Sequence, residues 1–103
     1  MSIKHVTFDD SGTIAFGSLA ANYQTVLSLS DDSDLVYLFN TTDVPVTMRV
    51  PSGTSTKEIR LPISATITLD CRSNSKRIAK GLIEVKCPAS LPTSGEVTVI
   101  ALR

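Results

Sequence analysis

Apolar and polar residues alternate along several short stretches of the chain, which is the pattern of strands that bury one face. In residues 66–71 the positions Ile67, Leu69 and Cys71 share one side, and Thr or Asp residues occupy the other. Residues 82–87 and 96–102 alternate in the same way. The pattern predicts strands over residues 24–30, 35–39, 44–50, 57–61, 66–71, 82–87 and 96–102.

Two of these stretches carry an additional signal. Residues 35–39 are continuously apolar, as expected of a strand that is central or covered on both faces. Pro45 cannot donate a hydrogen bond to a neighbouring strand, so the strand near it begins there or lies at an edge. Clusters of Asp, Asn, Gly, Ser and Pro separate the predicted strands and indicate turns.

The composition agrees with an all-β fold. Val, Ile and Thr together number 29, and their branched side chains suit a pleated surface. We predict one β-sandwich domain over residues 1–103, with about seven to nine antiparallel strands in an Ig-like or jelly-roll arrangement. A small barrel is a weaker alternative. Residues 1–13 are mixed in character and are predicted to form an edge strand or an N-terminal arm.

Charge and aromatic content narrow the classes of partner. Ten basic and ten acidic residues give a formal net charge of zero, so the chain lacks a global basic field for nucleic acid or a membrane surface. No stretch reaches the length of a transmembrane helix, and residues 1–5 do not resemble a signal peptide. We therefore expect synthesis in the cytoplasm and neither a nucleic-acid nor a membrane partner.

Candidate chemistry is sparse. A zinc site needs three or four ligands at workable spacing, whereas the chain offers His5, Cys71 and Cys87 without a Cys-x-x-Cys motif. Nothing marks an activated nucleophile or a phosphate-binding loop. We therefore predict neither enzyme activity nor a cofactor. Both cysteines occupy inward positions, and the absence of an export signal favours free buried thiols over a disulfide.

Charged loops supply the remaining candidates. The acidic turn at residues 31–34 lacks the spacing of a calcium loop and is interpreted as a solvated turn. Basic residues cluster between positions 72 and 80 without interleaved aromatic residues, which favours a solvated loop or a protein contact over nucleic-acid binding. If an interface exists, we expect it along residues 1–13, the loop at 51–56 and this basic segment. The candidate residues are Lys4, His5, Phe8, Arg72, Lys76, Arg77 and Lys80.

Several turn and strand motifs resemble those of a known group of proteins. They include the Asn-Thr-Thr-Asp turn at residues 40–43 and the segment Gly-Leu-Ile-Glu-Val at 81–85. They also include the Pro-Thr-Ser-Gly turn at 92–95 with the alternating strand that follows it, and the pairs Leu69-Asp70 and Ser73-Asn74. Over residues 35–102 the chain resembles small β-sandwich virion proteins of tailed bacteriophages.

The resemblance implies a structural role without catalytic residues. Proteins of this kind decorate or cement the capsid, commonly as trimers at local threefold positions. The implied partners are the major capsid protein or other virion proteins, and the implied location is the virion. Two alternatives stay open: another virion part, such as a tail, collar or head-fibre base, or a small carbohydrate-binding β-module. The latter would depend on Tyr23 or Tyr37 for stacking against a sugar.

Overall fold

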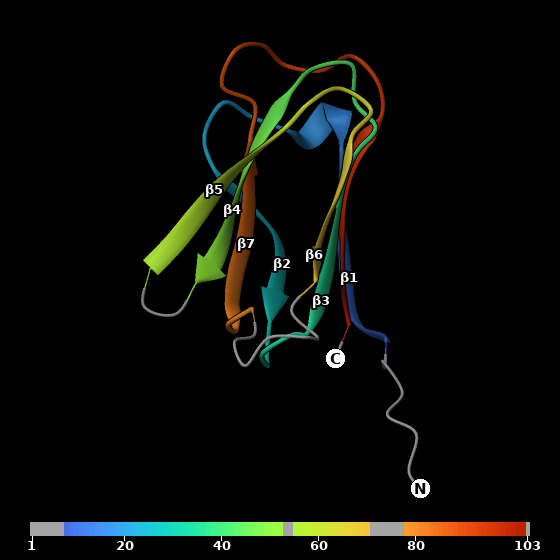
Figure 1. Cartoon of the computed structure of the whole chain (residues 1–103). Helices are drawn as coiled ribbons and strands as arrows, with labels where there is room; N and C mark the ends of the chain where they lie inside the picture. Colours follow the sequence, from blue (N-terminus) through green and yellow to red (C-terminus); the bar gives the residue numbers. More distant parts are fainter. Residues whose placement is uncertain (1–7, 53–54, 71–77, 103) are drawn as a thin grey trace, which may run out of the picture.

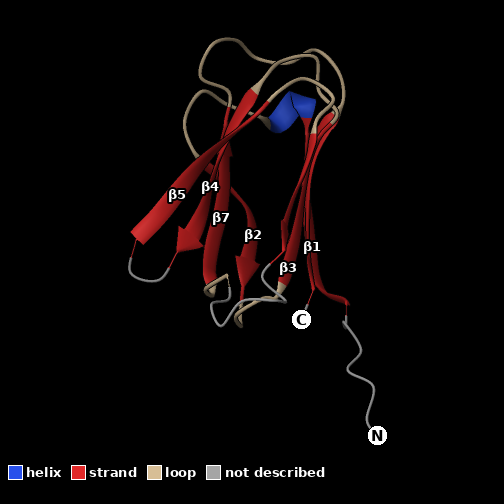
Figure 2. Ribbon diagram, in the orientation of Figure 1, coloured by secondary structure: helices blue, strands red, loops and turns tan. Residues whose placement is uncertain are grey.

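The computed structural model describes residues 8–52, 55–70 and 78–102. These residues form two four-stranded antiparallel sheets that pack face to face (Figures 1 and 2). The predicted β-sandwich is therefore confirmed. Its strands are β1 (Phe8–Ala15), β2 (Gln24–Leu29), β3 (Leu35–Asn40), β4 (Val46–Ser52), β5 (Ser55–Leu61), β6 (Thr66–Asp70), β7 (Gly81–Lys86) and β8 (Glu96–Leu102), and a short 3-10 helix, η1 (Phe16–Ser18), follows β1.

The strand order decides between the two predicted sandwich types. Sheet I has the order β1-β8-β3-β6, and sheet II has the order β2-β7-β4-β5. The ladders β1–β8, β2–β7, β3–β6 and β4–β5 are nested, so the chain is a long hairpin rolled into two layers. This nested order over eight strands is that of a jelly roll.

Most predicted strands appear at the expected positions, and 96–102 matches β8 fully. Residues 8–13 of the expected arm or edge strand belong to β1, the edge of sheet I that pairs with β8. The predicted loop at 51–56 needs correction, because Pro51 pairs with Thr56 at the end of the β4–β5 hairpin. Position 53–54 of that hairpin lies outside the described residues.

The core lies between the inner faces of the two sheets. Strand β3 is central in sheet I, as its apolar run predicts, and its inner residues Val36 and Leu38 are completely buried. Sheet II contributes Met48 and Val85, which are also completely buried. Full burial of side chains of this size contributes about 1.5–3 kcal/mol each. Pro45 directly precedes β4, which fits the first of its two predicted positions.

A buried polar network fastens the end of the sandwich where the β3–β4, β5–β6 and β7–β8 connections meet, hereafter the upper end (Figure 1). The Asn40 amide nitrogen donates to the carbonyl oxygens of Val44, Leu61 and Pro62 at 2.9, 3.2 and 3.0 Å. Its side-chain oxygen accepts from the Thr42 backbone N–H and hydroxyl. One buried amide therefore joins two connections.

A second set of contacts ties the β7–β8 connection to the same end. The Asp43 carboxylate accepts from the Thr93 backbone N–H at 2.9 Å and from the Thr93 hydroxyl. Gly95 has a φ of 85°, and a Cβ there would lie 2.1 Å from the Thr41 carbonyl oxygen. Only glycine fits this close approach without strain. The two turn motifs of the sequence analysis thus form one structural unit.

The two cysteines have different outcomes. Cys87 is a buried free thiol, and burial raises its pKa above the ordinary value of 9.0. A buried neutral thiol behaves as a small apolar side chain, as predicted. Cys71 lies outside the described residues.

Candidate interaction surfaces

The outer face of sheet I is apolar at its centre. Tyr37 and Phe39 point outward from β3 with their ring centroids 6.2 Å apart, and Ile100 and Leu102 stand beside them on β8. All four are half-buried in the isolated chain. We call this surface the uncharged face; its rim consists of Ser11, Thr13, Thr66, Thr68 and Thr98.

Charge is kept to the margins of the uncharged face. Among the described side chains that point outward from sheet I, the charged ones are Glu96 and Asp70, which lie near opposite ends of the sheet. The threonines interact locally, as in the 3.1 Å contact between the hydroxyls of Thr13 and Thr98. A flat surface with an apolar centre and a polar, neutral rim is suited to contact with another protein.

The outer face of sheet II has the opposite chemistry. Arg49 on β4 donates from Nε and Nη2 to one carboxylate oxygen of Glu84 on β7, at 3.0 and 2.7 Å. The ring of Tyr23 covers this pair, 4.0 Å from the Arg49 guanidinium carbon and 4.7 Å from the Lys86 ammonium. We call this surface, completed by Glu58 on β5, the charged face.

The environment of Tyr23 limits which ligands its ring can contact. Burial raises the pKa of its hydroxyl above the ordinary value of 10.0, and the nearby negative charge of Glu58 raises it further. Two cations lie against the ring and favour its π-face electrostatically. A sugar would have to displace these cations in order to stack there. Tyr37, the other tyrosine considered for sugar binding, is half-buried beside Phe39.

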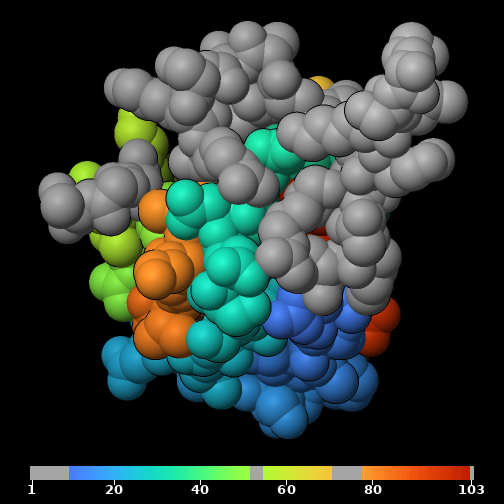
Figure 3. All heavy atoms as spheres, turned by 90° about the horizontal axis from the view of Figure 1, so that it is seen from below, coloured from blue at the N-terminus to red at the C-terminus, as the bar shows by residue number. Residues whose placement is uncertain are grey.

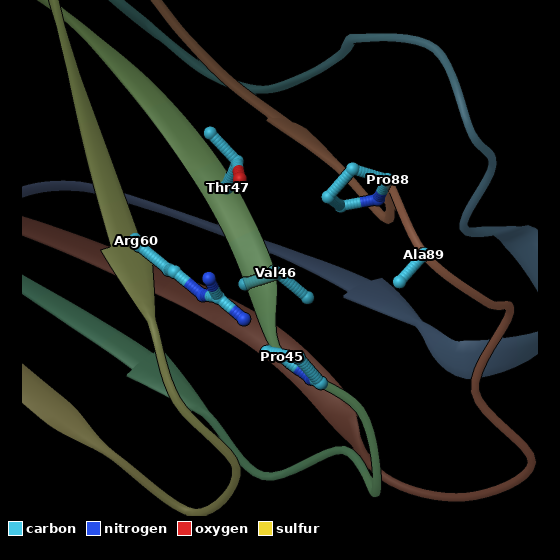
Figure 4. Close-up of a pocket in the computed structure, with 6 residues that line it drawn as sticks. All are labelled: Pro45, Val46, Thr47, Arg60, Pro88 and Ala89. Carbon is cyan, nitrogen blue, oxygen red and sulfur yellow. The ribbon is translucent and has the colours of Figure 1, made fainter.

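A shallow pocket of about 210 Å³ opens between β4, β5 and the start of the β7–β8 connection (Figure 4). Pro45 and Pro88 flank it, and Arg60 and Thr47 supply its polar groups. Thr47 pairs with Arg60 on one side and with Lys86 on the other, so two cations lie close to the pocket. Its lining residues include no group suited to act as a general base.

Large apolar side chains are exposed at the upper end of the sandwich. Phe16 on η1 is 42% exposed, Ile63 after β5 is 54% exposed, and Leu91 after β7 is 58% exposed. The Phe16 backbone N–H donates to the Gly95 carbonyl oxygen at 3.0 Å, which joins η1 to the β7–β8 connection. Their position on connections offers further contact points for a partner.

Of the seven interface residues predicted from the sequence, Phe8 and Lys80 lie within the described part of the chain. Lys4, His5, Arg72, Lys76 and Arg77 lie outside the described residues. Phe8 begins β1 opposite Leu102, and Lys80 is exposed just before β7, where its backbone N–H donates to Asp32 at 2.9 Å. The start of β1 and the start of β7 both lie at the end of the sandwich opposite η1 (Figure 1).

Sequence reasoning missed both faces as surfaces. Alternation placed Glu84 and Lys86 on the outer side of their strand, but the partner Arg49 is set by cross-strand register, which no local pattern contains. Tyr37 and Phe39 lie in an apolar run, so the sequence indicated burial on both sides. A usable signal was the threonine content of the neighbouring strand β6.

Three further findings bear on the class of protein. Within residues 8–52, 55–70 and 78–102, no three His, Cys, Asp or Glu side chains gather as a metal site would require. No helix in this part of the chain is long and apolar enough to cross a membrane. Comparison with protein-family models, curated proteins and solved structures finds no match.

Proposed function

We propose that this protein is a non-enzymatic structural component of a bacteriophage virion, which decorates or cements the capsid through protein–protein contacts. The observation that carries the proposal is the uncharged face. An apolar centre formed by Tyr37, Phe39 and Ile100, with a neutral threonine rim, can be covered by another protein without desolvating a charge.

The fold supports a structural role. Jelly rolls recur in viral capsid proteins, and also in lectins and cupins. The fold therefore supports a structural virion role, but the function has to be argued from the surface. The sequence resemblance to small phage virion proteins supports the virion as the location. In this chain the motifs at residues 40–43 and 92–95 contact each other and hold the upper end together.

The carbohydrate-binding alternative has less support. Tyr23 would have to offer a free ring face, and that ring already lies against Arg49 and Lys86. Tyr37 shares a flat sheet face with apolar neighbours, and the nearby groups that could bond sugar hydroxyls are threonine side chains. A face of this kind fits a protein surface better than a saccharide.

The proposal is tested by titrating purified protein onto capsids that lack it and measuring bound copies after density-gradient centrifugation. A capsid decoration protein saturates at a copy number set by the symmetry of the shell, because each repeat of the major capsid protein offers the same binding position. A local threefold position predicts three copies at each site. Saturation at a few copies per particle, or at a single vertex, contradicts decoration.

A pair of variants tests the surface. Phe39→Lys places a charge in the centre of the uncharged face and is expected to abolish capsid binding. Arg60→Glu changes an exposed charge on the opposite sheet and is expected to retain it. Circular dichroism and the unfolding midpoint of each variant establish that the fold is kept. Equal binding by the two variants contradicts the assignment of the face.

A further inference from the structure

A jelly roll has four sheet edges, and three of them are protected in this protein. The edges β1 and β2 close against each other, and Figure 3 shows the atoms of β1 (blue) meeting those of β2 (teal). Gly12 allows this approach, since a Cβ there would lie 2.1 Å from the Val26 carbonyl oxygen. Neither strand therefore offers a free edge to another chain.

The edge at β5 carries a charge pattern that blocks pairing. Lys57 is opposite the buried Val50, so it occupies the inner face of the edge strand. Its outward neighbours Glu58 and Arg60 are charged as well. Charged residues, above all lysines on the inward side, are the means by which proteins prevent edge-to-edge association.

The edge at β6 has none of these features along its central residues. No described strand pairs with its outer side, and β5 does not pack closely against it. Its outward positions carry Thr66 and Thr68, and its inward positions carry Ile67 and Leu69, which are only partly buried. Branched residues of this kind favour pairing with a further strand.

The backbone of β6 is directed appropriately. The Asn40 N–H donates to the Ala65 carbonyl oxygen at 2.9 Å, which marks Asn40 and Ala65 as a hydrogen-bonded position of the β3–β6 ladder. Hydrogen-bonded positions alternate along an antiparallel pair, so Ile67 and Leu69 bond to β3. The N–H and C=O groups of Thr66 and Thr68 therefore point to the open edge.

From this geometry we propose that β6 pairs antiparallel with β6 of a second copy of this chain, about a twofold axis at Thr68. The two Thr68 residues then oppose each other, and each exchanges its backbone hydrogen bonds with the other. Thr66 of each copy opposes Asp70 of the other, so the carboxylates do not face each other. On the inner side Ile67 meets Leu69, and the two cores become continuous.

This inference does not depend on the proposed function. If the protein does decorate a capsid at threefold positions, a twofold contact joins neighbouring trimers instead of closing one trimer, because local twofold axes relate adjacent threefold sites on an icosahedral lattice. Pairing of two edges leaves the uncharged face on the outer side of a continuous sheet of eight strands. The same contact would then cross-link the shell.

Two lysine variants of the same strand test the register. Thr68→Lys places two ammonium groups opposite each other and is expected to weaken self-association about fivefold, which shifts the average mass found by light scattering at intermediate concentration from that of the dimer toward that of the monomer. Thr66→Lys makes the same change of charge two residues away, but opposite Asp70, and is expected to leave association unchanged or tighten it by about twofold to fivefold. Both positions are exposed, and unfolding midpoints verify that both variants fold.

Other outcomes overturn the proposal. The contact is excluded if the mass of the smallest wild-type species does not double up to about millimolar concentration. Even a contact worth only about 4 kcal/mol would be detected there. Equal weakening by both variants excludes the register. Capsid binding is measured in a separate experiment. A failure to bind capsids would therefore not contradict pairing through β6, and a failure to pair through β6 would not contradict capsid binding.

Cross-linking gives a second readout. In a Cys71→Ser background, Thr68→Cys places two thiols across the twofold axis, where hydrogen-bonded positions bring Cα atoms to about 5.5 Å, within the range of a disulfide. Mild oxidation is expected to yield a covalent dimer. Thr56→Cys on the exposed β5 edge is the matched control and is expected to yield no covalent dimer, although its β6 edge is unchanged. Equal yields from the two variants contradict the proposal.

Discussion

The Thr42 hydroxyl donates a 2.6 Å hydrogen bond to the side-chain oxygen of Asn40, and both residues are almost completely buried. The Val44 carbonyl oxygen lies 2.8 Å from the same hydroxyl, so the two acceptors share its single hydrogen. With the three contacts from the Asn40 amide, this arrangement supplies donors to backbone carbonyls of the β3–β4 and β5–β6 connections.

Removal of the Asn40 side chain is expected to be strongly destabilising. Asn40→Ala removes a donor from the Leu61 and Pro62 carbonyl oxygens, of which Pro62 keeps the Ala65 N–H, and it removes the acceptor of the Thr42 N–H. Unsatisfied buried groups cost about 1–3 kcal/mol each. We expect a loss of about 2–4 kcal/mol in the free energy of unfolding, measured by urea denaturation. Asn22→Ala changes an exposed asparagine and should stay within about 0.5 kcal/mol of the wild type. Similar losses in both variants would contradict the role of the network.

The glycines provide a second matched pair. Gly95→Ala forces a side chain toward the Thr41 carbonyl oxygen at a φ of 85°, and we expect a loss of at least about 2 kcal/mol. Gly17→Ala meets no atom within 4 Å and should change stability by less than about 1 kcal/mol. Thermal and urea unfolding of the two variants decide the matter, and a well-tolerated Gly95→Ala would disprove the close approach.

The ion pair on the charged face should be measurable as a coupling energy. Side chains of Arg49 and Glu84 are 33% and 19% exposed, and partial burial with two donor nitrogens favours a stronger pair than a fully exposed one. A double-mutant cycle with Arg49→Met and Glu84→Gln is expected to give about 0.5–1.5 kcal/mol at low salt, and less at high salt. The control cycle uses Glu58 and Arg60, two exposed residues on one strand, and should give less than about 0.3 kcal/mol.

Acid should weaken the upper end of the sandwich through Asp43. Hydrogen bonds from the Thr93 hydroxyl, and next from its backbone N–H, hold the pKa of this carboxyl below its ordinary value of 3.8. A carboxylate whose folded pKa is depressed stabilises the fold fully above the unfolded pKa, and this contribution is lost as the pH falls through the folded pKa. Relative to Asp43→Asn, the wild type should therefore lose stability as the pH falls below about 3.8.

NMR titration measures the same effect directly. Thr93→Val removes the largest cause of the shift, so the pKa of Asp43 should rise toward 3.8 in this variant. An Asp43 pKa that is the same in the wild type and in Thr93→Val would show that the hydroxyl does not bind the carboxylate in solution.

Local pattern predicted the strands but not the way they pair. Alternation in residues 66–71 and 96–102 places Ile67, Val97 and Val99 inward, as the structure has them, because a period of two directly reports a strand with one buried face. The sequence left Ig-like and jelly-roll arrangements open, since the difference lies in ladders such as β1–β8 between distant parts of the chain. For the same reason β1 was predicted only as an edge strand or arm: its mixed sequence becomes a strand by pairing with β8.

The surfaces were harder to predict than the fold. Charge directed attention to Lys80 and the residues near it, whereas the structure draws attention to neutral side chains on sheet I and to the Arg49–Glu84 pair. The importance of Tyr37 depends on its neighbours across two ladders, Ile100 on one side and Thr68 on the other. Such combinations arise from register and are not visible in any single segment.

The pairing of β1 with β8 has a consequence for biosynthesis. Sheet I cannot be completed on the ribosome until β8 has emerged, because β8 lies between β1 and β3. Until then β1 and β3 each lack the strand that pairs with them. The core side chains Val36 and Leu38 of β3 also lack their neighbours on β8. Folding therefore has to wait for distant segments to meet, which is slow for such topologies. During this interval the unpaired edge and the apolar residues of β3 are accessible to other nascent chains, which favours association between incompletely folded copies.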